Sequence, residues 1–175
     1  MTLNFEFENQ EIKTQINYLL KQKPIFSLLI DSFNLFTINI FRCKNHIEIC
    51  SKYSEKKIIN TPFDFHQFSK EIEKIANCFY LNFNNANYYP YLNKIIYNEK
   101  ILLLNDIHNK ILINLIYFDK EGLNKLDLYK FLWEKDKNIS INKLDTHLTN
   151  LKNLINNNLA INLKFKSTNN LIFLN

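Results

Sequence analysis

The apolar spacing of residues 140–155 constrains the fold of this chain more than any other feature. Leu144, Leu148, Leu151 and Ile155 recur at intervals of three or four residues, which places them on one face of an α-helix. Polar side chains occupy the opposite face. The sequence therefore predicts an amphipathic helix whose apolar face packs on a core and whose polar face meets water or contacts a ligand.

The segments around this helix predict an ordered series of elements. Short β-rich runs divided by Asn and Pro indicate a small antiparallel sheet over residues 79–105. Helical patterns follow at 105–118, with Asn105 as N-cap, and at 124–134, where Leu126, Leu128, Phe131 and Leu132 are the apolar positions. Two alternating runs around "STNN" close the chain as a hairpin. Sheet, three helices and hairpin together are the order of a winged helix-turn-helix, with 140–155 as recognition helix.

The N-terminal part predicts a different order of helices and strands. It predicts an amphipathic helix over 8–22, a short apolar strand over 25–31 and a hairpin formed by "LFTINIFR" and "HIEICSKY". A short strand then leads through Pro62 into a helix with Asp64 as N-cap. We therefore predict an α+β protein with two domains, a small α/β unit over 1–78 and a winged helix-turn-helix domain over 79–175.

Composition and charge restrict the class of protein. The chain is 46% hydrophobic and 22% charged, as expected for a folded protein. Asp31, Asn34 and Asn39 interrupt the apolar run at 24–41, so buried strands explain it better than a membrane span. Three cysteines without CxxC spacing and the lack of a signal-peptide pattern favour the cytoplasm. The net charge of +5 permits a polyanionic partner without requiring one.

Four features of the C-terminal half carry a family resemblance. They are "LLND" (103–106), Gly122, Trp133 and "DTHLTNLK" (145–152), and they occur in this order. The set resembles the DNA-binding domain of OmpR/PhoB-type response regulators and covers roughly residues 79–175. The resemblance implies a winged helix-turn-helix fold and a transcription regulator that binds double-stranded DNA.

The same resemblance implies the residues of a DNA interface. Lys143, Asp145, Thr146, Thr149 and Asn150 fall where the family contacts bases or nearby phosphates, and Asn142 belongs to the same predicted surface. His147 and Lys152 fall at backbone-contacting positions, and Lys166, Ser167 and Thr168 belong to the wing. Thr149, Asn150 and Lys152 replace the arginines common in the family, which predicts weaker discrimination of G·C pairs.

The segment "IINTPFDFHQFSKEI" (58–72) looks like the end of a receiver domain, with Thr61 in place of the family's lysine. Asp31 has no neighbouring carboxylate for the Mg²⁺ site that phosphorylation needs. The resemblance therefore implies a shortened, degenerate receiver with no phosphoacceptor, whose remaining use is homodimerisation. Its further partners would be RNA polymerase or a regulatory protein.

The sequence offers little support for other chemistry. It contains no nucleophile–base pair, Gly-rich phosphate loop or paired carboxylates, so we predict no catalytic residues, no enzyme and no cofactor. Cys43, His46 and Cys50 lack a fourth ligand and the usual spacing, so no metal site is expected. The alternative to DNA binding is a protein-interaction module that keeps the winged-helix fold without binding DNA.

Overall fold

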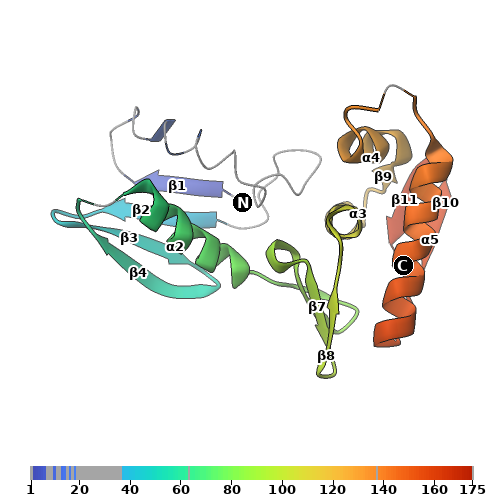
Figure 1. The fold of residues 1–175 in the computed structure, drawn as a ribbon, viewed down its shortest axis with the longest axis horizontal. Helices are drawn as coiled ribbons and strands as arrows, with labels where there is room; N and C mark the ends of the chain where they lie inside the picture. The colour runs from blue at the N-terminus through green and yellow to red at the C-terminus, as the bar shows by residue number, and fades with distance from the viewer. Residues whose placement is uncertain are drawn as a thin grey trace. The chain divides into compact units, whose positions relative to one another are not determined.

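The protein has an α+β fold that divides into two compact units between Tyr80 and Leu81 (Figure 1). The computed structural model describes residues 2–6, 10, 13, 14, 16, 18, 37–62, 64–136 and 138–174. Unit 1 comprises the described residues up to Tyr80, and unit 2 comprises those from Leu81 onward.

Among the described residues, unit 1 contains a four-stranded sheet with the helix α2 (Phe65–Asn77) against it (Figure 1). Its strands lie in chain order and are β1 (Thr2–Glu6), β2 (Thr37–Arg42), β3 (His46–Ser51) and β4 (Ser54–Asn60). Alternation along β2 and β3 buries the isoleucines at 38, 40, 47 and 49. The helix α2 (Phe65–Asn77) buries Phe68, Ile72 and Ile75. These two apolar faces form the core of the unit.

Several predictions for this unit are confirmed. The hairpin is β2–β3, and the Asp64 carboxylate caps α2 by accepting a hydrogen bond from the Gln67 backbone N–H at 2.7 Å. The described residues within 8–22 are helical, whereas the strand expected at 25–31 and Asp31 lie outside the described residues.

The topology of this sheet differs from the receiver resemblance. A receiver contains a parallel sheet, but among the described strands only β1 and β2 pair in parallel, and β2–β3 and β3–β4 are antiparallel. The short "CKN" connection explains the difference, because parallel neighbours need a crossover of a dozen or more residues. The described strands of unit 1 therefore do not form the parallel sheet of a receiver domain.

Unit 2 begins with the small antiparallel sheet expected from the sequence. Its strands are β5 (Leu81–Phe83), β6 (Ala86–Tyr89), β7 (Lys94–Tyr97) and β8 (Lys100–Leu103), with a 3-10 turn η2 (Pro90–Leu92) between β6 and β7. The β5–β6 and β7–β8 turns each place two consecutive residues at positive φ, Asn84–Asn85 and Asn98–Glu99. That geometry is typical of tight two-residue hairpins, and asparagine, which tolerates positive φ, occupies three of the four positions.

Three helices and a second sheet follow the first sheet in unit 2. In chain order they are α3 (Asp106–Tyr117), β9 (Leu123–Asn124), α4 (Lys125–Leu132), α5 (Ile141–Leu159), β10 (Phe165–Thr168) and β11 (Leu171–Leu174). The second sheet has the order β10-β11-β9. Asn105 caps α3, as expected, by accepting a hydrogen bond from the His108 backbone N–H at 2.8 Å.

Helix α3 is the centre of unit 2. It buries Ile111–Leu115 on all sides and packs against α4, α5 and β11. Asn109 is also buried, but both polar atoms of its amide are hydrogen-bonded: the oxygen accepts from the Tyr88 hydroxyl at 2.6 Å, and the nitrogen donates to the Pro90 carbonyl at 2.9 Å. These bonds join α3 to the first sheet of the unit.

Helix α5 buries the four predicted apolar residues and Leu159, and it extends four residues past the predicted end at Ile155. It stops at Ala160, which adopts a left-handed conformation. The hairpin β10–β11 turns at Asn169 and Asn170, both at positive φ, as the sequence predicts. One apolar assignment is wrong: Leu126 is exposed, because the α4 surface that packs inward is centred on Leu128 and Tyr129.

Gly122, the only glycine, precedes β9 and has φ of +77°. A Cβ atom at this position would lie 2.6 Å from two ring atoms of Phe173 on β11. Both the backbone conformation and the close ring therefore require glycine here.

We expect Gly122→Ala to lower the free energy of unfolding of unit 2 by about 1–3 kcal/mol, because alanine is strained at this φ and meets the Phe173 ring. Urea titration followed by fluorescence of Trp133, the only tryptophan, measures this unit alone. Ala160→Gly is the matched control, since it exchanges the same residue types at a positive φ where the Cβ is already accommodated. Equal stability of Gly122→Ala and the native chain would contradict the steric argument.

Candidate nucleic-acid interface

The candidate interface consists of the solvent-facing side of α5 and the hairpin β10–β11. Main-chain hydrogen bonds hold the hairpin in place, because β11 pairs with β9 and the Lys125 N–H donates to the Asn170 carbonyl at 2.9 Å. The linker from α5 is also anchored, since the Leu163 N–H donates to the Asn156 side chain at 2.8 Å. Helix and hairpin therefore form one rigid surface.

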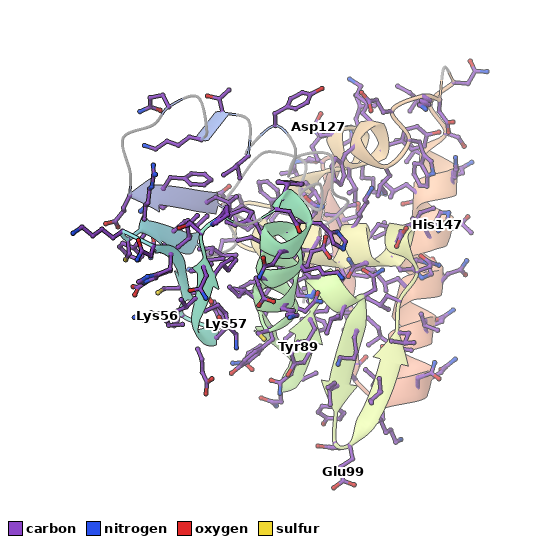
Figure 2. The ribbon with its side chains drawn as sticks, turned by 60° about the vertical axis from the view of Figure 1, so that its left-hand side comes forward. Lys56, Lys57, Tyr89, Glu99, Asp127 and His147 are labelled. Carbon is purple, nitrogen blue, oxygen red and sulfur yellow. The ribbon has the colours of Figure 1, made fainter. Side chains whose placement is uncertain are left out.

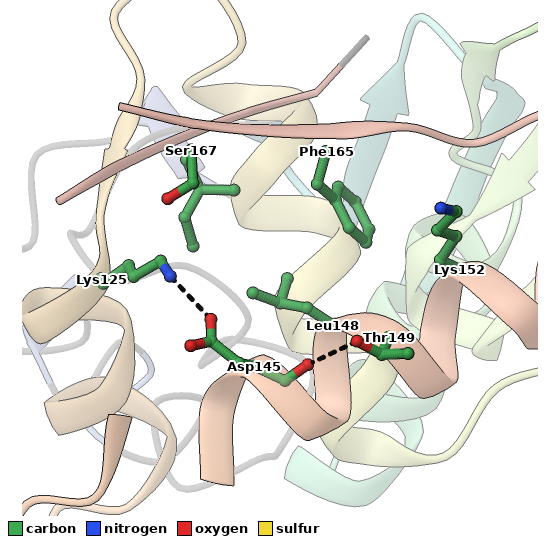
Figure 3. Close-up of a pocket in the computed structure, with 8 residues that line it drawn as sticks. Lys125, Asp145, Leu148, Thr149, Lys152, Phe165 and Ser167 are labelled. Carbon is green, nitrogen blue, oxygen red and sulfur yellow. Dashed lines mark hydrogen bonds and ion pairs between the residues drawn. The ribbon is translucent and has the colours of Figure 1, made fainter. Parts of the chain in front are cut away.

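A shallow groove of about 350 Å³ separates the start of β10 from the first half of α5 (Figure 3). Polar and apolar side chains line it together: Lys125, Asp145, Thr149, Lys152, Ser167, Leu148, Phe165 and Ile172. The Lys125 ammonium pairs with the Asp145 carboxylate at 2.7 Å at one end of the groove (Figure 3). The groove therefore presents lysines and hydroxyls beside a small apolar surface.

Uncharged polar side chains cover the exposed face of α5. Asn142, Thr146, Thr149 and Asn150 are all exposed. The Thr146 and Thr149 hydroxyls donate to the carbonyls of Asn142 and Asp145 at 2.8 and 2.9 Å, which leaves each hydroxyl oxygen free to accept. The Asn150 amide has no hydrogen-bond partner among the described residues. This face can therefore donate and accept hydrogen bonds without carrying charge.

Two charged residues of the predicted interface have partners within the protein. The Lys143 ammonium lies 2.8 Å from the Asp136 carboxylate and 4.2 Å from the centre of the Trp133 ring. Lys143 and, to a smaller extent, the Tyr129 hydroxyl lower the pKa of Asp136. The Asp145 carboxylate pairs with the Lys125 ammonium at 2.7 Å. Neither Lys143 nor Asp145 therefore presents an unpaired charge to a ligand.

Positive charge is concentrated in unit 2. From Leu81 to Asn175 there are 12 lysines against eight acidic residues, a net +4, whereas residues 1–80 contribute +1. Lys164 and Lys166 are exposed at the hairpin, and Lys152 on α5 is half-buried. None of these three lysines has an acidic partner among the described residues, and Ser167 and Thr168 are exposed beside them. The hairpin and the adjacent helix surface thus carry the charge that a polyanion would meet.

His147 lies apart from this polar surface, although it is one of the predicted backbone contacts (Figure 2). Its ring packs against His108 on α3 and Trp133 at the end of α4, with centroid distances of 5.7 and 5.4 Å. Its Nδ1 atom is buried without a hydrogen-bond partner among the described residues, as are both ring nitrogens of His108. His147 therefore contributes to packing between helices.

Sequence reasoning does not single out Lys125 or Lys164. Lys125 belongs to α4, and only the tertiary fold brings it to Asp145 on α5. Lys164 precedes the strand by one residue, and its signal is the Lys–Phe–Lys alternation with Lys166 that ordinary strand spacing produces. The remaining predicted residues, apart from Lys143, Asp145 and His147, lie together on the exposed helix face and hairpin.

Comparison of this chain with protein-family models, with curated proteins and with solved structures gave no match. Within the described part of the chain, no helix has the length and apolar content needed to cross a membrane.

The packed side chains of His108 and His147 predict that the stability of the protein depends on pH. Burial and, secondly, the nearby His147 lower the pKa of His108 below its ordinary value. The unfolded chain therefore takes up a proton on His108 at a higher pH than the folded chain does. As the pH falls below about 6.5, the unfolded state gains stability and the free energy of unfolding falls, down to the depressed pKa of the folded state.

We expect His108→Leu to flatten this decline, measured as the urea unfolding free energy from Trp133 fluorescence between about pH 7.5 and 5.5. Comparison with the native chain cancels the carboxylates that both proteins share. Parallel pH curves for the two proteins would show that His108 does not cause the decline.

Proposed function

We propose that the protein is a transcription regulator that binds double-stranded DNA through a winged helix-turn-helix in unit 2. In this proposal α5 enters the major groove and β10–β11 is the wing that contacts the flanking backbone. The observation that carries it is the rigid pairing of an uncharged, hydrogen-bonding helix face with a lysine-bearing hairpin. The order of elements in unit 2, a sheet, three helices and a terminal hairpin, supports it further.

The side chains of α5 suit particular bases. An asparagine amide can donate to and accept from adenine in the major groove, and a threonine methyl group can contact a thymine methyl group. Asn150 and Thr149 are both exposed for this purpose, and α5 contains no arginine to read guanine. We therefore propose a preference for A·T-rich sites, to which the shape of A·T-rich DNA would contribute.

Affinity would come from lysine–phosphate contacts. Lys152, Lys164 and Lys166 border the groove or the hairpin and have no acidic partner among the described residues. Each phosphate that they neutralise would release condensed counterions, so binding should weaken as salt increases.

We further propose that unit 1 forms a homodimer, because two half-sites supply the specificity that one short helix lacks. Ile58, with 57% of its surface exposed on β4 at the end of the described sheet, supports an apolar contact there. Regulation would depend on abundance or a protein partner, such as RNA polymerase or a regulatory protein, and not on phosphorylation.

A protein-interaction module is the second candidate. The internal pairing of Lys143 and Asp145 favours it, because it leaves α5 with less free charge than a phosphate-binding helix usually offers. The two functions differ in their response to nucleic acid, which makes them separable by one experiment.

Selection of the full-length protein on randomised double-stranded DNA, followed by sequencing at two salt concentrations, tests the proposal. Enrichment of an A/T-rich motif with two-fold repetition is expected. No enrichment, together with no binding at low salt, would reject DNA binding and favour the protein-interaction module.

On the selected motif, Asn150→Ala should weaken specific binding by about 1–3 kcal/mol, because an adenine would lose two hydrogen bonds. Fluorescence anisotropy with the motif and a scrambled duplex measures the difference. Asn87→Ala is the matched control, since Asn87 is an exposed asparagine on β6 of the same unit. An unchanged affinity for the motif would remove Asn150 from the base contacts.

Lys166→Ala should weaken binding to the motif and the scrambled duplex equally and reduce the slope of log affinity against log salt by about one. Lys100→Ala, which removes an exposed lysine from β8, should leave the slope unchanged. A native slope in Lys166→Ala would rule out a phosphate contact at this residue.

A further inference from the structure

The end of hairpin β2–β3 in unit 1 gathers three side chains of the types that bind transition metals. The Cys43 sulfur, a His46 ring nitrogen and a Glu48 carboxylate oxygen all lie within 4.8 Å of one another, and all three residues are half-buried. We call this set the Cys43–His46–Glu48 cluster. It differs from the combination that the sequence suggests, because Glu48 takes the place of Cys50.

The backbone holds these side chains in position. His46 and Glu48 are two residues apart on β3 and therefore project from the same face of the sheet. The Cys43 N–H donates to the His46 carbonyl at 2.9 Å and closes the two-residue turn that separates them. The buried Ile47 and Ile49 point to the opposite face. The cluster is thus fixed by a hairpin and remains open to solvent.

We infer that the Cys43–His46–Glu48 cluster is a binding site for a divalent transition-metal ion, with Zn²⁺ as the best match. Thiolate, imidazole and carboxylate are the three ligand types that Zn²⁺ takes in proteins. Calcium and magnesium prefer oxygen-only sites.

The spacing of the donor atoms agrees with a tetrahedral ion. Zinc–nitrogen and zinc–oxygen bonds of about 2.0–2.2 Å at tetrahedral angles place the two ligand atoms about 3.4 Å apart. The His46 Nε2 atom lies 3.3 Å from Glu48 Oε1. The cysteine sulfur needs only a side-chain adjustment to complete three ligands, and water fills the fourth position.

Lys56 is the group that the ion must displace. Its ammonium lies 2.9 Å from Glu48 Oε1 (Lys56 is labelled in Figure 2), and the lysine side chain is 51% exposed. It can therefore swing away without unfolding of the sheet. On binding, the Cys43 thiol loses its proton to solvent and a metal–sulfur bond forms. The thiolate, the carboxylate and the ion then sum to zero charge, and Lys56 remains as a nearby cation.

Titration of the full-length protein with Co²⁺ under reducing conditions tests the site, because cobalt reports both thiolate ligation and coordination geometry in its absorption spectrum. We expect saturation at one ion per chain, a thiolate-to-cobalt charge-transfer band and the intense visible bands of a tetrahedral site. Zn²⁺ should displace the cobalt and abolish both signals.

Matched variants assign the ligands. Cys43→Ser should abolish the charge-transfer band, and His46→Gln and Glu48→Gln should each weaken cobalt binding by about 10-fold or more. Cys50→Ser, Cys78→Ser and His66→Gln should leave the spectrum and affinity unchanged. Far-ultraviolet circular dichroism confirms that each variant keeps its fold. A Cys43→Ser protein that retains the band, loss of the band in Cys50→Ser, or the absence of saturable binding would overturn the inference.

Discussion

The buried hydrogen bonds of Asn109 are the interaction on which unit 2 depends. Helix α3 is enclosed by the first sheet, α4, α5 and β11, so a polar side chain in it must find its partners within the protein. Tyr88 supplies the donor and Pro90 the acceptor, and burial raises the pKa of the tyrosine so that its hydroxyl keeps the proton it donates. Loss of one partner would leave the other buried and unpaired, which costs about 1–3 kcal/mol. The candidate interface rests on this helix, because α5 and β11 both pack against α3.

Local patterns were sufficient to predict most elements of this fold. The apolar period of α5, the Asp64 and Asn105 caps and the asparagine turn of the last hairpin each depend on residues that are near one another in the chain. The burial of α3 on all sides was harder to predict from the sequence. A fully buried helix lacks a polar face, and its buried Asn109 and Asn114 are residue types that usually lie on the surface. The direction of the β1–β2 pair was also beyond prediction, since the partners are separated by more than thirty residues.

In the candidate sites, too, the sequence predicts features that depend on neighbouring residues but not contacts between distant segments. Periodicity identified which α5 residues are exposed, but it could not show that Lys143 pairs with Asp136, that Asp145 pairs with Lys125, or that His147 packs between aromatic rings. Those contacts join different segments of unit 2. The Cys43–His46–Glu48 cluster is an intermediate case: strand alternation places His46, Glu48 and Cys50 on one face, and only the geometry of the turn decides that Cys43 joins the first two.

The internal ion pairs have a consequence for how the proposed DNA complex would divide its binding energy. Charged side chains attract every phosphate alike, whereas amide and hydroxyl groups favour particular bases. On α5 the charges of Lys143 and Asp145 are already compensated, and the exposed Asn150 and Thr149 are neutral. Lys164 and Lys166, which have no acidic partner among the described residues, lie at the hairpin. Sequence discrimination would therefore arise mainly on the helix, and general affinity mainly on the hairpin. Added salt would weaken the general affinity, because it opposes the lysine–phosphate contacts, and would leave the ratio between specific and non-specific binding nearly unchanged.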